Sequence, residues 1–77
     1  MFGARLKLAR AAAGLSLRAL EERLEGLVTA RAIGKYERDE AMPSSTVLIA
    51  LARALKVTEE FLLDSRRVVA FESVENS

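Results

Sequence analysis

The chain has 77 residues, a length that accommodates one small domain with one modest core. Its formal charge of +1, from 12 basic and 11 acidic residues, is not the strongly basic balance of a protein that binds nucleic acid through charge alone. Because cysteine and histidine are both absent, disulfides and the commonest borderline metal ligands are excluded, and we expect no metal and no cofactor.

Helical signals dominate the chain, beginning with a helix predicted at about residues 2–13. Its apolar stripe consists of Phe2, Leu6, Ala9 and Ala13. Gly14 follows this stripe, where a left-handed residue ends many helices. Ser16 is then a typical N-cap for a second helix, which ends near Gly26. The apolar side of this second helix consists of Leu17, Leu20 and Leu24.

A third helix is predicted over residues 30–37, with Thr29 as its N-cap and with Ile33 and Tyr36 at a helical spacing. The loop that follows is closed by Pro43.

A fourth helix is predicted over residues 46–55, capped by Ser44 or Ser45. Its inward-facing residues are Val47, Leu48, Leu51, Ala52 and Leu55. Thr58 then caps a short fifth helix. The pattern therefore predicts an all-α bundle of about five short helices, which we assign to a domain at residues 1–64.

Residues 65–77 form a tail of different character, rich in β-branched and aromatic residues before a polar end. This tail is a short strand, a linker to a further domain, or a dimerisation segment. We expect an apolar dimer contact formed by Leu63, Val68, Val69 and Phe71. The alternative is that the tail folds back on its own domain.

The second and third predicted helices have the lengths and the connecting turn of a helix-turn-helix. In that motif the second helix lies in the DNA major groove, so its inner face must be apolar and its outer face polar. Arg31 and Lys35 lie four residues apart on the outer stripe. Ala30 and Gly34 share that region and are small, which allows the backbone to approach DNA closely.

Several short features occur in a characteristic order over about three quarters of the chain. They are Arg10, Gly14-Leu15-Ser16, Leu20, Leu24, Ile33-Gly34-Lys35-Tyr36-Glu37, Pro43, and Leu51-Ala52-Arg53-Ala54-Leu55 with Val57. With these features, residues 6–63 resemble the five-helix DNA-binding domain of the xenobiotic-response-element family, to which lambda-type phage repressors and Cro-like proteins belong. The segments Lys35-Tyr36-Glu37-Arg38 and Met42-Pro43-Ser44-Ser45 are also similar to the N-terminal domains of regulators that carry a zinc metallopeptidase domain. This similarity implies either a fragment of a longer regulator or a stand-alone relative.

The resemblance implies roles for individual positions. The base-reading positions are Ala30, Arg31, Gly34 and Lys35. The phosphate-contacting positions are Ser16, Thr29, Arg38 and Ser44. Arg10 and Glu37 fall where the family forms a buried ion pair between its first and third helices.

Three positions depart from the family pattern. Glu21 replaces the usual alanine at the contact between the two motif helices, and we expect its carboxylate to reach solvent or to pair with Arg31 or Lys35. Leu17 replaces a glutamine that holds phosphate, so that contact is lost. The turn at residues 25–28 is longer than the minimal pattern, which affects the angle between the helices.

We therefore expect a sequence-specific, homodimeric regulator of transcription, in particular a repressor, that binds double-stranded DNA through residues 30–37. The alternative is a protein-interaction module or an antitoxin that binds a partner protein with the same fold. An enzyme is not expected, because histidine and cysteine are absent and the acidic pairs are adjacent in sequence, where they do not converge on a helix. The longest apolar run, residues 47–52, is too short to span a bilayer, so we expect a cytoplasmic protein without membrane contact.

Overall fold

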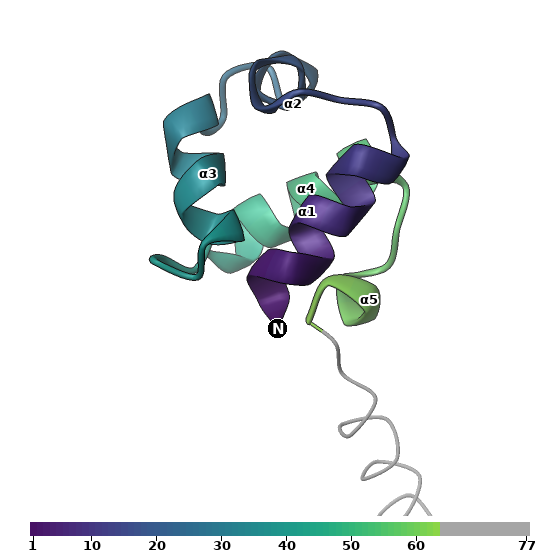
Figure 1. Ribbon diagram of the computed structural model, residues 1–77. Helices are drawn as coiled ribbons and strands as arrows, with labels where there is room; N and C mark the ends of the chain where they lie inside the picture. The colour runs from purple at the N-terminus through teal and green to yellow at the C-terminus, as the bar shows by residue number, and fades with distance from the viewer. Residues whose placement is uncertain (64–77) are drawn as a thin grey trace, which may run out of the picture.

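The computed structural model describes residues 1–63 of the chain (Figure 1). Its elements are α1 (Phe2–Ala12), α2 (Leu17–Arg23), α3 (Ala30–Glu37), α4 (Ser45–Leu55) and α5 (Glu59–Leu63). No strand occurs within these 63 residues, and the predicted all-α bundle of five helices is confirmed. The tail at 65–77 lies outside the described residues, as do three members of the expected dimer contact, Val68, Val69 and Phe71.

Hydroxyl side chains start the last four helices, as the sequence predicts. Each hydroxyl oxygen accepts a hydrogen bond from the backbone N–H three residues later, which satisfies a donor that has no partner within the helix. The four pairs are Ser16 with Ala19 at 3.0 Å, Thr29 with Ala32 at 3.0 Å, Ser44 with Val47 at 3.3 Å and Thr58 with Phe61 at 2.9 Å. The cap of α4 is thus Ser44, and α4 begins one residue earlier than expected, at Ser45.

Left-handed residues end the first four helices. Gly14 follows α1 with φ +73°, as predicted. The other three are Glu25 after α2, Asp39 after α3 and Lys56 after α4, with φ between +57° and +60°. Ala13 is the C-cap of α1 and is exposed, so its expected place on the buried stripe is wrong. The stripe ends at Ala9 because the helix ends before its next turn is complete.

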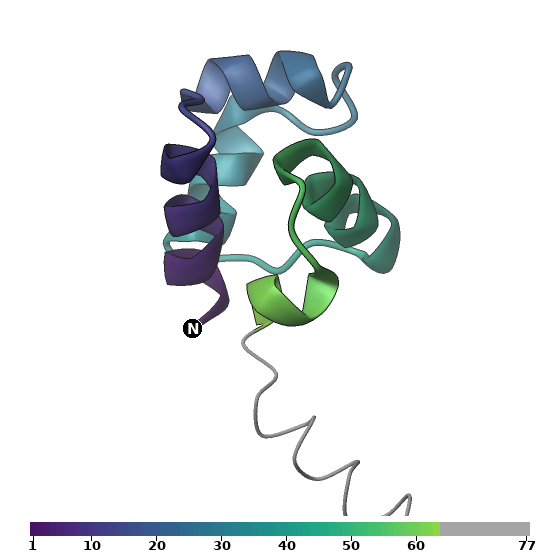
Figure 2. The same cartoon turned by 90° about the vertical axis from the view of Figure 1, so that its right-hand side faces the viewer.

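The core draws on every helix. Five side chains are fully buried, one from each helix in chain order: Leu6, Leu20, Ile33, Leu51 and Leu62. Figure 2 shows α2 crossing one end of the bundle, with α1 and α3 on one side and α4 and α5 on the other. All five helices therefore meet around one core, and α3 is held from several directions.

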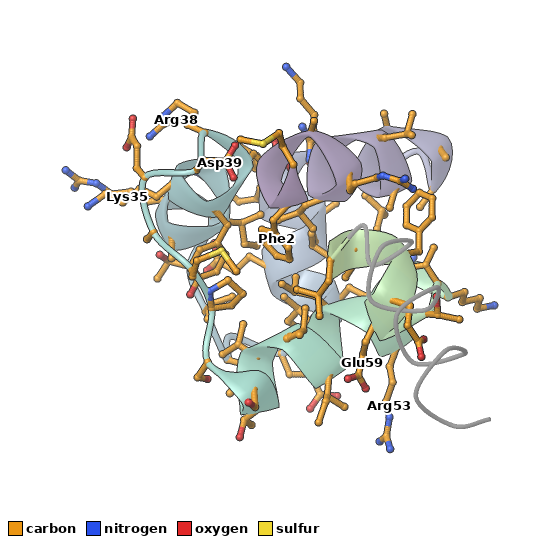
Figure 3. All side chains as sticks on the ribbon, turned by 90° about the horizontal axis from the view of Figure 1, so that it is seen from below. Phe2, Lys35, Arg38, Asp39, Arg53 and Glu59 are labelled. Atoms are coloured by element: carbon orange, nitrogen blue, oxygen red, sulfur yellow. The ribbon has the colours of Figure 1, made fainter. Side chains whose placement is uncertain are left out.

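The start of α1 approaches the end of α3 very closely. A Cβ atom on Gly3 would lie only 2.3 Å from the Glu37 carbonyl oxygen, so glycine alone permits this approach. The Gly3 N–H also donates to Asp39 Oδ1 at 3.0 Å, which satisfies a donor at the open start of α1. Figure 3 shows Asp39 close to this end of α1, with Phe2 directed into the interior. This junction fixes where the last turn of α3 lies.

Candidate nucleic-acid interface

The two sides of α3 have opposite character. Ile33 is fully buried and Tyr36 is half-buried, whereas Arg31 and Lys35 are exposed. Figure 3 shows Lys35 and Arg38 on the outer side of the molecule, away from Phe2. The helix thus packs an apolar side against the core and presents basic side chains to solvent. A helix that enters a major groove needs this arrangement.

Gly34 does not share this outer surface. It is buried, and a Cβ atom added there would lie 3.3 Å from Arg38 Nη1 and 3.7 Å from Leu17 Cδ1. The expected outward placement of Gly34 beside Arg31 and Lys35 is therefore wrong. Position 34 faces the start of α2, and Leu17 and the Arg38 guanidinium cover it. Ala30 is half-buried at the start of the helix.

Glu21 makes a contact that the sequence analysis missed. Its Oε1 accepts a hydrogen bond of 2.8 Å from the backbone N–H of Ala30, the first residue of α3. We expected this carboxylate to reach solvent or to pair with Arg31 or Lys35, but it is half-buried and bonded to a backbone N–H. The physical reason is that the first N–H groups of a helix lack partners within the helix and carry positive partial charge, which suits a carboxylate.

Arg10 and Glu37 join α1 to the last turn of α3. Arg10 Nε and Nη2 donate to the two carboxylate oxygens of Glu37 at 2.5 and 3.1 Å, and Arg10 Nη1 donates to the Leu15 carbonyl at 2.8 Å. The side chains are only 15% and 7% exposed. The hydrogen bond with Glu37 raises the pKa of the Arg10 guanidinium, against an opposing effect of burial. This fork-shaped pair holds α3 in one orientation on α1.

The positions expected to contact phosphate lie on the surface. Ser16, Thr29 and Ser44 are exposed at the starts of α2, α3 and α4, where their hydroxyl oxygens already accept cap hydrogen bonds. Arg38 is exposed just after α3 and donates to Glu40 at 3.0 Å. The hydrogen bond from Arg38 lowers the pKa of Glu40, and the positive charges of Arg38 and Lys35 act in the same direction.

A second surface lies on α4 and α5. Arg53, Ile49 and Leu63 line a shallow groove there, together with Val57 and Glu59. Leu63, the one described member of the expected dimer contact, is 43% exposed. Figure 3 shows Arg53 and Glu59 at the opposite edge of the molecule from Lys35 and Arg38. The groove is therefore separate from the basic surface of α3.

Among residues 1–63, no three acidic side chains gather in a way that could hold a metal ion. In the same part of the chain, none of the helices combines the length and the apolar character that crossing a bilayer requires.

Comparison with known families agrees with this geometry. A family model described as helix-turn-helix matches residues 6–62, which run from within α1 to within α5. The chain belongs to the helix-turn-helix family. Its domain is of the xenobiotic-response-element, lambda-repressor-like type, and the family is one of DNA-binding regulators rather than enzymes. No curated protein and no solved structure matches the chain.

Proposed function

We propose that this helix-turn-helix protein is a sequence-specific repressor that places α3 in the major groove of double-stranded DNA. The observation that carries the proposal is the pair of exposed basic side chains, Arg31 and Lys35, on a helix whose other side is buried and ion-paired. A reading helix must keep one orientation while it presents long polar side chains, and α3 meets both requirements.

Arg31 and Lys35 are the main base-reading residues in this proposal. Either side chain can donate to O6 and N7 of guanine, a contact that contributes about 1–3 kcal/mol of discrimination when its geometry is good. Ala30 offers a methyl group, which suits the methyl group of thymine. Gly34 is buried and is not assigned a base.

Contacts to phosphate then set the position of the domain on the duplex. Ser16 and Ser44, at the starts of α2 and α4, and Arg38, after α3, are exposed and available for this role. Thr29, the fourth predicted phosphate contact, lies next to the Glu21 carboxylate, where a phosphate would meet a like charge.

We also propose that the protein acts as a homodimer and that it acts in the cytoplasm. Two copies joined through Leu63 and the tail would meet two half-sites about 34 Å apart, one turn of the duplex. The dimer then blocks a promoter by occlusion. The exposed Leu63 supports this contact from the described part of the chain.

The test is selection of bound sequences from random duplex DNA, followed by fluorescence polarisation with the selected duplex. Arg31→Ala and Lys35→Ala should each weaken binding about 5- to 150-fold, which corresponds to about 1–3 kcal/mol. Arg53→Ala is the matched control, because it removes the same charge from an exposed position on α4. Binding that responds equally to all three variants, or selection without an enriched sequence, would contradict the proposal. A palindromic consensus would support the dimer.

The groove on α4 and α5 favours a second candidate function, in which a partner protein binds there, as an antitoxin binds its toxin. Exposed Ile49 and Leu63 give this groove apolar area away from α3. In that case Ile49→Glu releases the partner protein and leaves DNA affinity unchanged. A partner retained by Ile49→Glu would contradict this candidate.

A further inference from the structure

The start of α3 is occupied by the protein's own negative charge. Ala30 N–H, the first donor of the helix, is bonded to Glu21 Oε1 at 2.8 Å. Ala32 N–H in the same turn is bonded to Thr29 Oγ1 at 3.0 Å. Two N–H groups that open the helix are thus already satisfied, one of them by a carboxylate from α2.

The position of this carboxylate is where an external anion would bind. N–H groups and the helix dipole make the start of a helix attractive to phosphate oxygens. An anion that accepts the Ala30 hydrogen bond must lie where Glu21 Oε1 now lies. Because Glu21 is half-buried between α2 and α3, its negative charge also repels a phosphate from this point.

The same contact spans the long turn between the two motif helices. Residues 24–29 connect α2 to α3, and Glu25 and Gly26 both have positive φ, at +57° and +79°. Figure 1 shows this turn leading from α2 to the beginning of α3. A hydrogen bond from one helix directly to the other fixes the start of α3 independently of the path of the turn.

We propose that Glu21 takes the place of a DNA phosphate at the start of the reading helix, so that α2 rather than the DNA backbone holds this end of α3. The inference rests on the proposed function, in which α3 enters the major groove. Glu21 is then a positioning residue, Thr29 serves as a helix cap only, and recognition depends on the side chains of Arg31 and Lys35.

Three variants separate the charge of Glu21 from its hydrogen bond. Glu21→Gln keeps an oxygen that can accept from Ala30 N–H but removes the charge. Glu21→Ala removes both the charge and the acceptor. Glu22→Ala is the matched control, since Glu22 is the exposed neighbour on α2 and its loss changes the net charge equally. Circular dichroism checks that each variant is folded.

The first measurement needs no DNA. In the NMR spectrum of the free protein, Glu21→Ala should move the Ala30 amide proton upfield, because its carboxylate acceptor is gone. Glu22→Ala should leave the Ala30 amide proton where it is in the wild type, and Glu21→Gln should change it less than Glu21→Ala does. An Ala30 amide proton that responds equally to Glu21→Ala and Glu22→Ala would overturn the inference.

The second measurement is a phosphate scan of the selected duplex, in which each phosphate in turn is replaced by an uncharged methylphosphonate. Wild type, Glu21→Gln and Glu22→Ala should be sensitive to the same set of phosphates. Glu21→Ala should be sensitive to one further phosphate. Replacing that phosphate with methylphosphonate should weaken binding by this variant about two- to fivefold, the usual effect of an anion at a helix start.

The outcomes distinguish the inference from the function on which it rests. If selection with the wild type yields no duplex that it binds, both the proposed function and this inference are contradicted. A wild type that binds, combined with an unchanged set of sensitive phosphates in Glu21→Ala, overturns the inference alone. The same result follows if the wild type is already sensitive at the phosphate that Glu21→Ala is expected to gain.

Discussion

The inner and outer sides of α3 are specified in different ways. On the inner side, α1 approaches so closely that Gly3 has no room for a side chain, and Arg10 forms a fork with Glu37. On the outer side, Arg31 and Lys35 extend into solvent. Changes on the inner side should therefore act on stability and change DNA binding through it, whereas changes on the outer side should act on DNA binding alone.

The two ion pairs at the end of α3 show the same contrast at close range. Arg10 and Glu37 are 15% and 7% exposed, whereas Arg38 and Glu40 are 58% and 52% exposed. Loss of one partner leaves an unpaired, poorly hydrated charge in the first pair, but water replaces the partner in the second. Sequence distance differs too, because Arg10 and Glu37 are 27 residues apart and Arg38 and Glu40 only two.

The largest effect is expected from Glu37→Ala. In this variant the Arg10 side chain, only 15% exposed, loses its main partner. This loss should lower the free energy of unfolding by about 3 kcal/mol, the lower end of the usual range. Urea unfolding measures this change. The double variant Arg10→Met with Glu37→Leu should be less destabilised, because neither charge remains. A single variant as stable as the double variant would contradict the contrast between the two pairs.

Gly3→Ala should be the next largest effect. The added methyl group would overlap the Glu37 carbonyl, so α1 must shift away from α3, and we expect a loss of about 1–3 kcal/mol of stability. Thermal unfolding by circular dichroism is a suitable measurement. Lys7→Ala is the control, because Lys7 is exposed on the same helix and its substitution should change stability little. A Gly3→Ala variant as stable as the wild type would show that α1 can shift away from α3 without a loss of stability, which would contradict this prediction.

The smallest effect concerns the exposed pair. Arg38 lowers the pKa of Glu40 first through their hydrogen bond, so Arg38→Ala should raise this pKa towards its ordinary value. Because the pKa is lowered in the folded state, the stabilisation from this pair is present at neutral pH and is lost as the pH falls through the folded pKa of Glu40. A carbon-13 NMR titration of the Glu40 carboxyl measures the shift. Lys35→Ala should raise the pKa of Glu40 less than Arg38→Ala does, since Lys35 acts only through its charge. Equal shifts of the Glu40 pKa in both variants would contradict the role of the hydrogen bond.

Local patterns predicted most of the helices and their starting points. Ser16, Thr29 and Thr58 bond to N–H groups three residues later, so the signal and the structure lie within one turn of chain. The exposure of Arg31 and Lys35 was also predictable, because helical periodicity places them opposite Ile33. The five helices and the membership of the helix-turn-helix family were predictable from the same local signals, caps and helical periodicity, and from their order along the chain.

The amino-acid sequence by itself thus determined where the helices lie and which side chains α3 shows to solvent, because both depend on periodicity and on caps a few residues away. Only the tertiary structure decided that Glu21 bonds to Ala30, that Gly34 is covered, and that Asp39 accepts from Gly3. These contacts depend on the distance and rotation between helices. The packing of one core sets those quantities, and no local pattern in the chain encodes them.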